Sequence, residues 1–165
     1  MQKFGWDFEN FIKSKKFSIV DIIPSAVSEL TTVIVNQIKN MKAQRLVLDS
    51  LTVAAMGWKE SPTEFFKFRI KVFDLLRTLK QLGVTSLLVS EIPQGSDEIS
   101  RFGFEEFLTD GIIHLYNMRR ENARFRGLEI LKLRGSKHSN RIVPVSIRTN
   151  GITVHPELEF FEEVK

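Results

Sequence analysis

The chain has 165 residues, 42% of them hydrophobic, so it can bury one ordinary core, and we expect a single domain. It has no cysteine, which excludes disulfides and thiolate metal sites, and no apolar run approaches the roughly 20 residues that cross a bilayer. The net charge of +4 permits anionic partners such as a nucleotide or nucleic acid but requires none. The first residues lack an apolar run of the secretory kind, so we expect a cytoplasmic protein with no membrane partner.

The first half of the chain alternates helices and strands. In chain order, periodicity predicts helix 6–16, strand 17–23, helix 28–41, strand 45–50, helix 63–82 and strand 84–90. In helix 28–41, Leu30, Ile34 and Ile38 form one apolar stripe, and Gly83 is the expected C-terminal cap of helix 63–82. The inward-facing residues predicted for helix 63–82 are Phe66, Ile70, Phe73 and Leu76 to Leu79. Near-continuous apolar strands that alternate with helices predict parallel strands in an α/β fold.

After Glu91 the pattern changes to that of an antiparallel edge. A short helix near Glu105 precedes two strands, 111–118 and 127–134, which the charged turn 119–126 joins. Strands 143–147 and 152–155 pair around Asn150-Gly151, a dipeptide that favours tight hairpins. His114 lies inside an apolar strand, where we expect a hydrogen-bonded core residue rather than a ligand.

A cluster of cations ends the strand within residues 128–138. Alternation along a strand places Glu129, Leu131 and Leu133 on one face and, on the other face, Ile130, Lys132 and Arg134. With Ser136 and His138 on the turn beyond, such a fork of cations can bind a phosphate. The alternative is a solvated basic edge that discourages strand-to-strand aggregation, and periodicity alone favours this alternative.

Polar side chains also end the two apolar strands of the first half. Asp49 follows one strand, and Ser90 and Glu91 follow the other. Ligands of open α/β sheets bind at the carboxyl ends of the strands, where a carboxylate can hold Mg²⁺ against nucleotide phosphates. For Asp49 the pattern alone favours an ordinary turn or helix-cap residue, and for Ser90 and Glu91 an ordinary polar strand end is equally compatible with the sequence.

Two further observations restrict the chemistry. No glycine-rich loop followed by Lys and Ser or Thr occurs, so the chain lacks a P-loop to surround a triphosphate. Glu105 and Glu106 are neighbours on a helix and point in different directions, so we interpret them as surface residues rather than as an acid/base pair.

Several blocks together resemble the RecA-like ATPase domain of the KaiC family, and the resemblance runs nearly end to end. The blocks 100–107 and 128–138 are the most specific, and 45–52 resembles the Walker B strand. The remaining blocks are 4–7 with 16–21, 79–85, 90–91 and 151–156. The resemblance implies an α/β, RecA-like three-layer sandwich whose mainly parallel sheet is extended by antiparallel C-terminal strands.

The resemblance also implies site residues. In that family ATP lies between the subunits of a ring, usually a hexamer. Asp49 would be the Walker B carboxylate associated with Mg²⁺, and Lys132, Arg134 and His138 would reach the phosphates of a neighbour's ATP. Leu133 and Ser136 would lie close to the nucleotide, and Lys3 near its base, whereas Arg148 and Thr149 depart from the pair found at those positions in the best-known member.

Three interpretations of function therefore stand side by side. The first is a KaiC-like ATPase domain that lacks the first strand, the P-loop and the catalytic glutamates, so that residues 1–165 alone do not hydrolyse ATP. The second is a nucleic-acid-binding module that uses Arg119, Arg120, Arg124 and Arg126. The third is a non-catalytic scaffold or regulatory subunit that lends its cations to a full-length ATPase partner.

Overall fold

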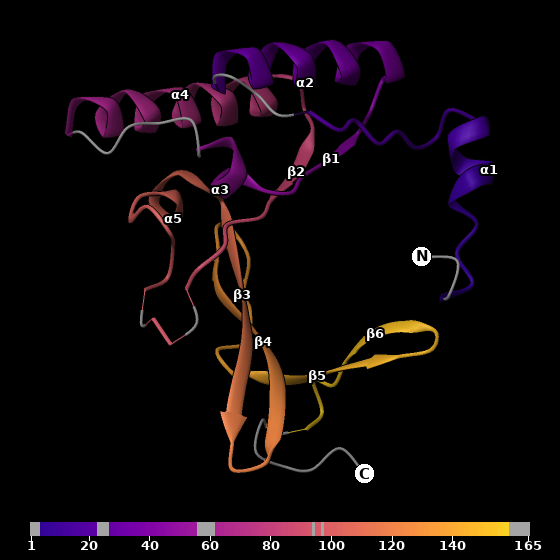
Figure 1. The fold of residues 1–165 in the computed structure, drawn as a ribbon, viewed down its shortest axis with the longest axis vertical. Coiled ribbons are helices and arrows are strands. Elements are labelled where there is room, and N and C mark those ends of the chain that lie inside the picture. The colour runs from indigo at the N-terminus through magenta and orange to yellow at the C-terminus, as the bar shows by residue number, and fades with distance from the viewer. Residues whose placement is uncertain (1–3, 23–26, 56–61, 94, 97, 159–165) are drawn as a thin grey trace. The chain divides into compact units, whose positions relative to one another are not determined.

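The structure, a computed structural model, describes residues 4–22, 27–55, 62–93, 95–96 and 98–158. Residue contacts divide the chain into two compact units (Figure 1). The parallel unit comprises residues 14–108, and the antiparallel unit comprises residues 1–13 with 109–165. The helices and strands follow the predicted order, apart from one predicted strand that is absent and one short helix, residues 51–54, that was not predicted.

The parallel unit is built on a two-stranded parallel sheet. Strand β1 (Arg45–Leu48) pairs with β2 (Thr85–Leu88), which confirms the parallel pairing expected from the alternation of strands and helices. Its helices are α2 (Val27–Met41), α3 (Leu51–Ala54), α4 (Pro62–Gln81) and α5 (Glu105–Leu108). The predicted strand 17–23 is wrong for residues 17–22, which form no strand, and residue 23 lies outside the described residues. No ladder in the described part of the chain includes these residues, and the side chains of Ile19 and Val20 are exposed.

Two clusters of buried side chains hold the parallel unit together. The predicted stripe of α2, Leu30, Ile34 and Ile38, is buried as expected. This stripe packs in one cluster with the α4 residues Leu75 and Leu79. The second cluster consists of Leu51, Phe68, Val72 and Phe104.

Helix α4 is rotated relative to the prediction. Phe66, Ile70 and Phe73 were expected to face inward but are exposed, and Phe68 and Val72 are buried instead. The helix is apolar on more than one side, so its own periodicity does not choose a face. The choice depends on Phe104 and Phe102, whose rings lie 5.6 and 4.9 Å from the Phe68 ring and come from a distant segment.

The end of α4 agrees with the prediction. Gly83 adopts a φ of +67°, in the left-handed region that glycine enters without steric strain. Its N–H donates to the Lys80 carbonyl at 3.0 Å, and the Val84 N–H donates to the Leu79 carbonyl at 3.2 Å. These two bonds form a Schellman cap that turns the chain from α4 into β2.

The antiparallel unit is a four-stranded sheet of order β3-β4-β5-β6 with helix α1 (Phe8–Lys13) from the N-terminal segment. The strands are β3 (Gly111–Arg120), β4 (Ala123–Leu133), β5 (Val143–Arg148) and β6 (Gly151–Val154). The β5–β6 hairpin around Asn150-Gly151 is confirmed. The turn predicted over 119–126 is shorter, because Arg119 pairs with Arg124 within the β3–β4 ladder.

None of the helices in the described part of the chain combines the length and the hydropathy that crossing a bilayer requires.

Candidate functional site

The carboxyl ends of β1 and β2 lie side by side, as the sequence predicts. Asp49 follows β1 directly and is exposed. The Val89 N–H donates to the Leu48 carbonyl at 2.9 Å, and the Leu51 N–H donates to the Val89 carbonyl at 2.8 Å. These backbone bonds extend the pairing beyond both strands, so Asp49 and Ser90 stand at the same edge of the sheet.

Glu105 has a structural role that the sequence analysis missed. It is only 7% exposed, so its interpretation as a surface residue is wrong. Its carboxylate accepts hydrogen bonds from the Ser90 hydroxyl at 3.0 Å and from the backbone N–H groups of Phe102 and Phe104 at 3.2 Å. The position of Glu105 in the first turn of α5, where carboxylates are favoured, was the available signal.

Two further contacts shape this edge. The Glu91 N–H donates to the Thr52 hydroxyl at 2.9 Å, which ties the end of β2 to α3 while the Glu91 side chain stays exposed. The buried Ser50 hydroxyl caps α3 by accepting from the Val53 N–H at 3.2 Å. Thr52 was not among the predicted site residues, because its contact with Glu91 spans 39 positions of sequence.

A β-bulge changes the faces of β4. Ile113 pairs with Ile130 and Ile112 pairs with Lys132, so Leu131 is an extra residue in the ladder. Ile112 and Ile113 are successive residues of β3, so their side chains point to opposite faces of the sheet. Residues that pair across two strands lie on the same face, so Lys132 lies on the face of Ile112 and Ile130 on the face of Ile113. The prediction that they share a face is therefore wrong, and Lys132 lies instead on the face of Glu129.

Lys132 and Arg134 nevertheless meet at one short segment, Thr109-Asp110. The Lys132 ammonium donates to the Thr109 carbonyl at 2.6 Å. The Arg134 Nη1 lies 3.4 Å from Asp110 Oδ1, and the Arg134 N–H donates to the Asp110 carbonyl at 2.8 Å. The structure thus brings the two predicted cations together and gives each a partner that the sequence analysis did not name.

Three of the remaining predicted residues, Leu133, Ser136 and His138, lie at or beyond the end of β4. Leu133 and Ser136 are exposed, and the Ser136 N–H donates to the Leu133 carbonyl at 3.3 Å across the turn. His138 is half-buried, with Nδ1 3.2 Å from the Ser139 carbonyl oxygen. Lys3 lies outside the described residues. His114 is half-buried and stacks on the Tyr116 ring, with ring centroids 4.4 Å apart.

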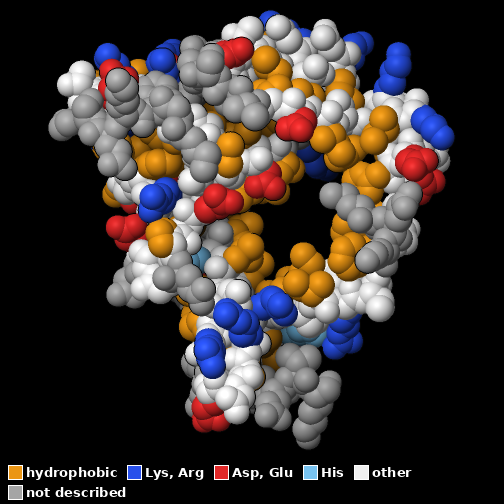
Figure 2. Space-filling model, viewed as in Figure 1, with side chains coloured by type: hydrophobic (Ala, Val, Ile, Leu, Met, Phe, Trp, Pro, Cys, Tyr) orange, Lys and Arg blue, Asp and Glu red, His pale blue; other side chains and the backbone are white. Residues whose placement is uncertain are grey.

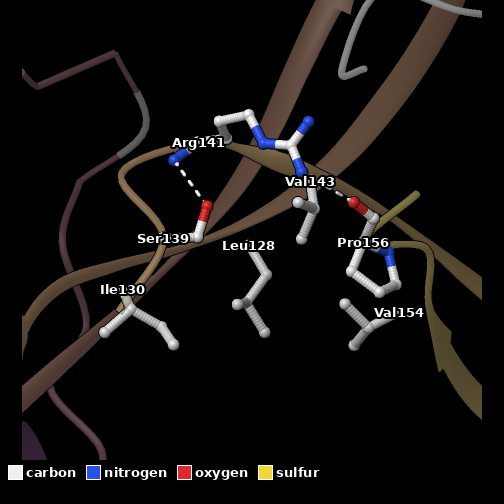
Figure 3. A pocket seen from close by; sticks show the side chains of 7 residues that line it. All are labelled: Leu128, Ile130, Ser139, Arg141, Val143, Val154 and Pro156. Atoms are coloured by element: carbon white, nitrogen blue, oxygen red, sulfur yellow. Dashed lines mark hydrogen bonds between the residues drawn. The ribbon is translucent and has the colours of Figure 1, made fainter. Parts of the chain in front are cut away.

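A pocket of about 190 Å³ opens on the antiparallel unit (Figure 3). Its apolar wall comes from β4, β5 and β6, and its rim carries Arg141, whose guanidinium donates to the Pro156 carbonyl at 3.2 Å. Its lining consists of Leu128, Ile130, Ser139, Arg141, Val143, Val154 and Pro156. None of the predicted site residues lines it.

Comparison with known proteins decides the family. A family profile described as "ATPase: KaiC" matches residues 1–159. The chain belongs to the KaiC ATPase family. A KaiC-like protein of the archaeon Pyrococcus horikoshii superposes with a TM-score of 0.80 at 35% identity, covering 94% of this chain and 68% of that one. The expected α/β, RecA-like fold of the family is therefore confirmed.

Curated relatives in the KaiC family are longer than this chain. The circadian clock oscillator protein KaiC of Prochlorococcus marinus is 32% identical over 161 residues, which are 92% of this chain and 31% of that protein. Circadian clock oscillator protein KaiC 1 of Synechocystis is 32% identical over 163 residues, with 93% and 31% covered. The chain thus spans about a third of the length of these relatives.

Proposed function

We propose that this chain forms part of an ATPase site that lies between neighbouring subunits of a homo-oligomeric ring. It supplies a Walker B carboxylate to its own site and cations to the nucleotide of a neighbour. A hexamer in the cytoplasm is the assembly that the sequence resemblance implies.

The observation that carries this proposal is the meeting of Lys132 and Arg134 at the end of β4. Both cations contact Thr109-Asp110, so their charges lie close together on one unit. An ammonium and a planar guanidinium side by side suit the terminal phosphates of a nucleotide, which carry several acceptor oxygens. The Leu133 position between the two cations, with Ser136 and His138 just beyond them, would complete the surface that faces a neighbour's ATP.

Asp49 is the residue that would hold Mg²⁺. No group of three or more His, Asp or Glu gathers around a possible metal position in the described part of the chain. Mg²⁺ in nucleotide sites is typically held by one or two carboxylates with phosphates and waters, so a single exposed Asp49 at a strand end fits this ion. When bound, Mg²⁺ would neutralise the charge on the phosphates.

Ser90 and Glu91 would connect this edge to the rest of the parallel unit. Ser90 donates to the buried Glu105, and the backbone of Glu91 is fixed by Thr52. A change at the nucleotide phosphates would reach α5 through the hydrogen bond between Ser90 and Glu105. Lys3 is proposed near the base from the resemblance alone.

The test is ATP hydrolysis by the protein as its gene encodes it, including any in-frame segment upstream of Met1. We expect Lys132→Ala or Arg134→Ala to lower kcat by about 10²–10³-fold, as loss of one transition-state donor does, while ATP binding is largely kept. Lys137→Ala, an exposed cation of the same segment, is the matched control. Normal turnover in both variants would reject the assignment. Reading the genomic sequence upstream of Met1 for a P-loop separates an ATPase from a scaffold that lends its cations to a partner.

Binding of nucleic acid is a second candidate, favoured by the end of the β3–β4 hairpin. Arg119 and Arg124 are exposed and lie directly opposite each other, and Arg126 is exposed nearby. Figure 2 shows Lys and Arg side chains gathered over this hairpin. Like charges in directly opposed positions destabilise a ladder, and a bound polyanion would relieve this. Fluorescence anisotropy of single-stranded DNA at increasing salt tests the idea; the absence of binding at low salt rejects it.

A further inference from the structure

The side chain of Asp110 contacts Arg134, one of the two cations, Lys132 and Arg134, at the end of β4. Asp110 lies one residue before β3, and its backbone carbonyl accepts the N–H of Arg134 at 2.8 Å. The next residue, Gly111, pairs with Leu133, and a Cβ at position 111 would lie 3.2 Å from a methyl group of Leu133. The backbone of Asp110 is therefore held in place beside the end of β4, and this fixes the position from which its carboxylate contacts Arg134.

The ion pair between Asp110 and Arg134 is weak enough for another anion to take the place of the carboxylate. The Nη1–Oδ1 distance is 3.4 Å, and the two side chains are 53% and 55% exposed. Strong guanidinium–carboxylate bonds are shorter, about 2.7–2.9 Å, and exposed pairs contribute little because water screens them. Lys132 differs, because it is half-buried and its ammonium bonds a carbonyl at 2.6 Å. A phosphate would therefore displace Asp110 from Arg134 more easily than it would move Lys132.

We propose that Asp110 is an internal counterion of the phosphate site, which occupies Arg134 in the absence of nucleotide and gives way when a phosphate arrives. The proposal rests on the proposed function, since Arg134 must be a phosphate ligand. The carboxylate has two effects on affinity: a phosphate must displace it from Arg134, and its charge repels the phosphate. Asp110 thus lowers the affinity of the site for polyphosphates.

A purely structural role for Asp110 predicts the opposite change in the affinity for polyphosphates when its charge is removed. If the carboxylate only held Arg134 in a binding geometry, its removal would weaken anion binding. The direction of the change therefore separates the two roles.

The test is calorimetric titration of residues 1–165 with inorganic triphosphate at low ionic strength. Asp110→Asn keeps the size of the side chain and removes its charge, and we expect it to tighten binding by up to about fivefold, the equivalent of one exposed ion pair. Glu121→Gln in the β3–β4 turn removes the same charge at the other end of the hairpin and is expected to leave affinity unchanged. The gain should disappear in the double variant with Arg134→Ala, because the effect acts through that residue.

The outcomes separate this proposal from the proposed function. Unchanged or weaker binding by Asp110→Asn, together with weaker binding by Arg134→Ala, overturns the counterion role alone. Because residues 1–165 contain no P-loop, their binding of triphosphate depends on the cations at the end of β4, so equal binding by the wild type and Arg134→Ala overturns both. Should Asp110→Asn fail to fold, Asp110→Ser provides the same comparison.

Discussion

Tyr116 is the one tyrosine of the chain, and its environment makes a quantitative prediction about pH. Its hydroxyl donates to Glu129 at 2.6 Å. This hydrogen bond, with smaller contributions from burial and from the charge of Glu129, raises the pKa of Tyr116 from 10 to about 12. We expect the absorbance change of tyrosinate to appear near pH 12, and Glu129→Gln to move it back toward pH 10.

The same shift has a consequence for stability. A pKa that is raised in the folded state gives a contribution that is fully present below the unfolded pKa and is lost as pH rises. The part of the free energy of unfolding due to Tyr116 should therefore fall between pH 10 and about pH 12. In Tyr116→Phe this part of the decline should be absent from urea unfolding curves, and an identical decline in both proteins would contradict the assignment.

Glu105 allows a second test at the scale of single residues. Its carboxylate accepts from two backbone N–H groups and from Ser90, and it is nearly fully buried. An amide at this position turns one acceptor into a donor that faces other donors, so we expect Glu105→Gln to cost about 1–3 kcal/mol in the free energy of unfolding. The exposed Glu98→Gln is the matched control, and equal stability of the two variants would show that the carboxylate is not needed.

Single residues show where inference from sequence succeeds. Asp49 and Ser90 were predicted at one edge because the pattern of parallel strands fixes where strand ends meet. Thr52, Glu105 and Asp110 were not predicted as partners of the site. Their contacts join positions 15 to 39 residues apart, and no local pattern specifies such pairs.

At the scale of elements, helix α4 offers a matched pair of phenylalanines. Phe68 is 3% exposed and packs against the rings of Phe102 and Phe104, whereas Phe66 is 63% exposed. Phe68→Ala should lower the free energy of unfolding by about 3–5 kcal/mol, because it removes buried surface and leaves a cavity. Phe66→Ala should change it by no more than about 0.5 kcal/mol. Thermal or urea unfolding measures both, and a larger loss for Phe66→Ala would mean that the face predicted from the sequence is the buried one.

The positions of most helices and strands could be predicted from the sequence, but which face of each is buried could not always be. Helix α2, the cap at Gly83 and the β5–β6 hairpin follow from local periodicity and turn chemistry. The faces of α4 and β4 do not, since a ring from a distant loop and one extra residue in a ladder decide them. The bulge at Leu131 reverses the face of Lys132, so even a correct strand assignment gave a wrong account of its neighbours.

At the scale of the whole molecule, the β1–β2 sheet exposes apolar side chains on one face. Val47 and Leu87 are directly paired there and are 64% and 58% exposed. Parallel sheets are normally covered on both faces, and paired exposed apolar side chains favour association. We therefore expect residues 1–165 to self-associate in sedimentation velocity as the concentration rises.

The physical origin of this association can be separated from that of any charge-mediated contact. Apolar association persists when sodium chloride is added and is strengthened by sulfate, whereas contacts through exposed charges weaken. The double variant Val47→Thr, Leu87→Thr should associate less than the wild type. The control Ile19→Thr removes an exposed apolar side chain outside any strand and should associate as the wild type does. A monomer at all concentrations with a cooperative melt at high temperature would show that this face is compatible with a stable single chain. Association lost on adding salt would instead assign it to the exposed cations.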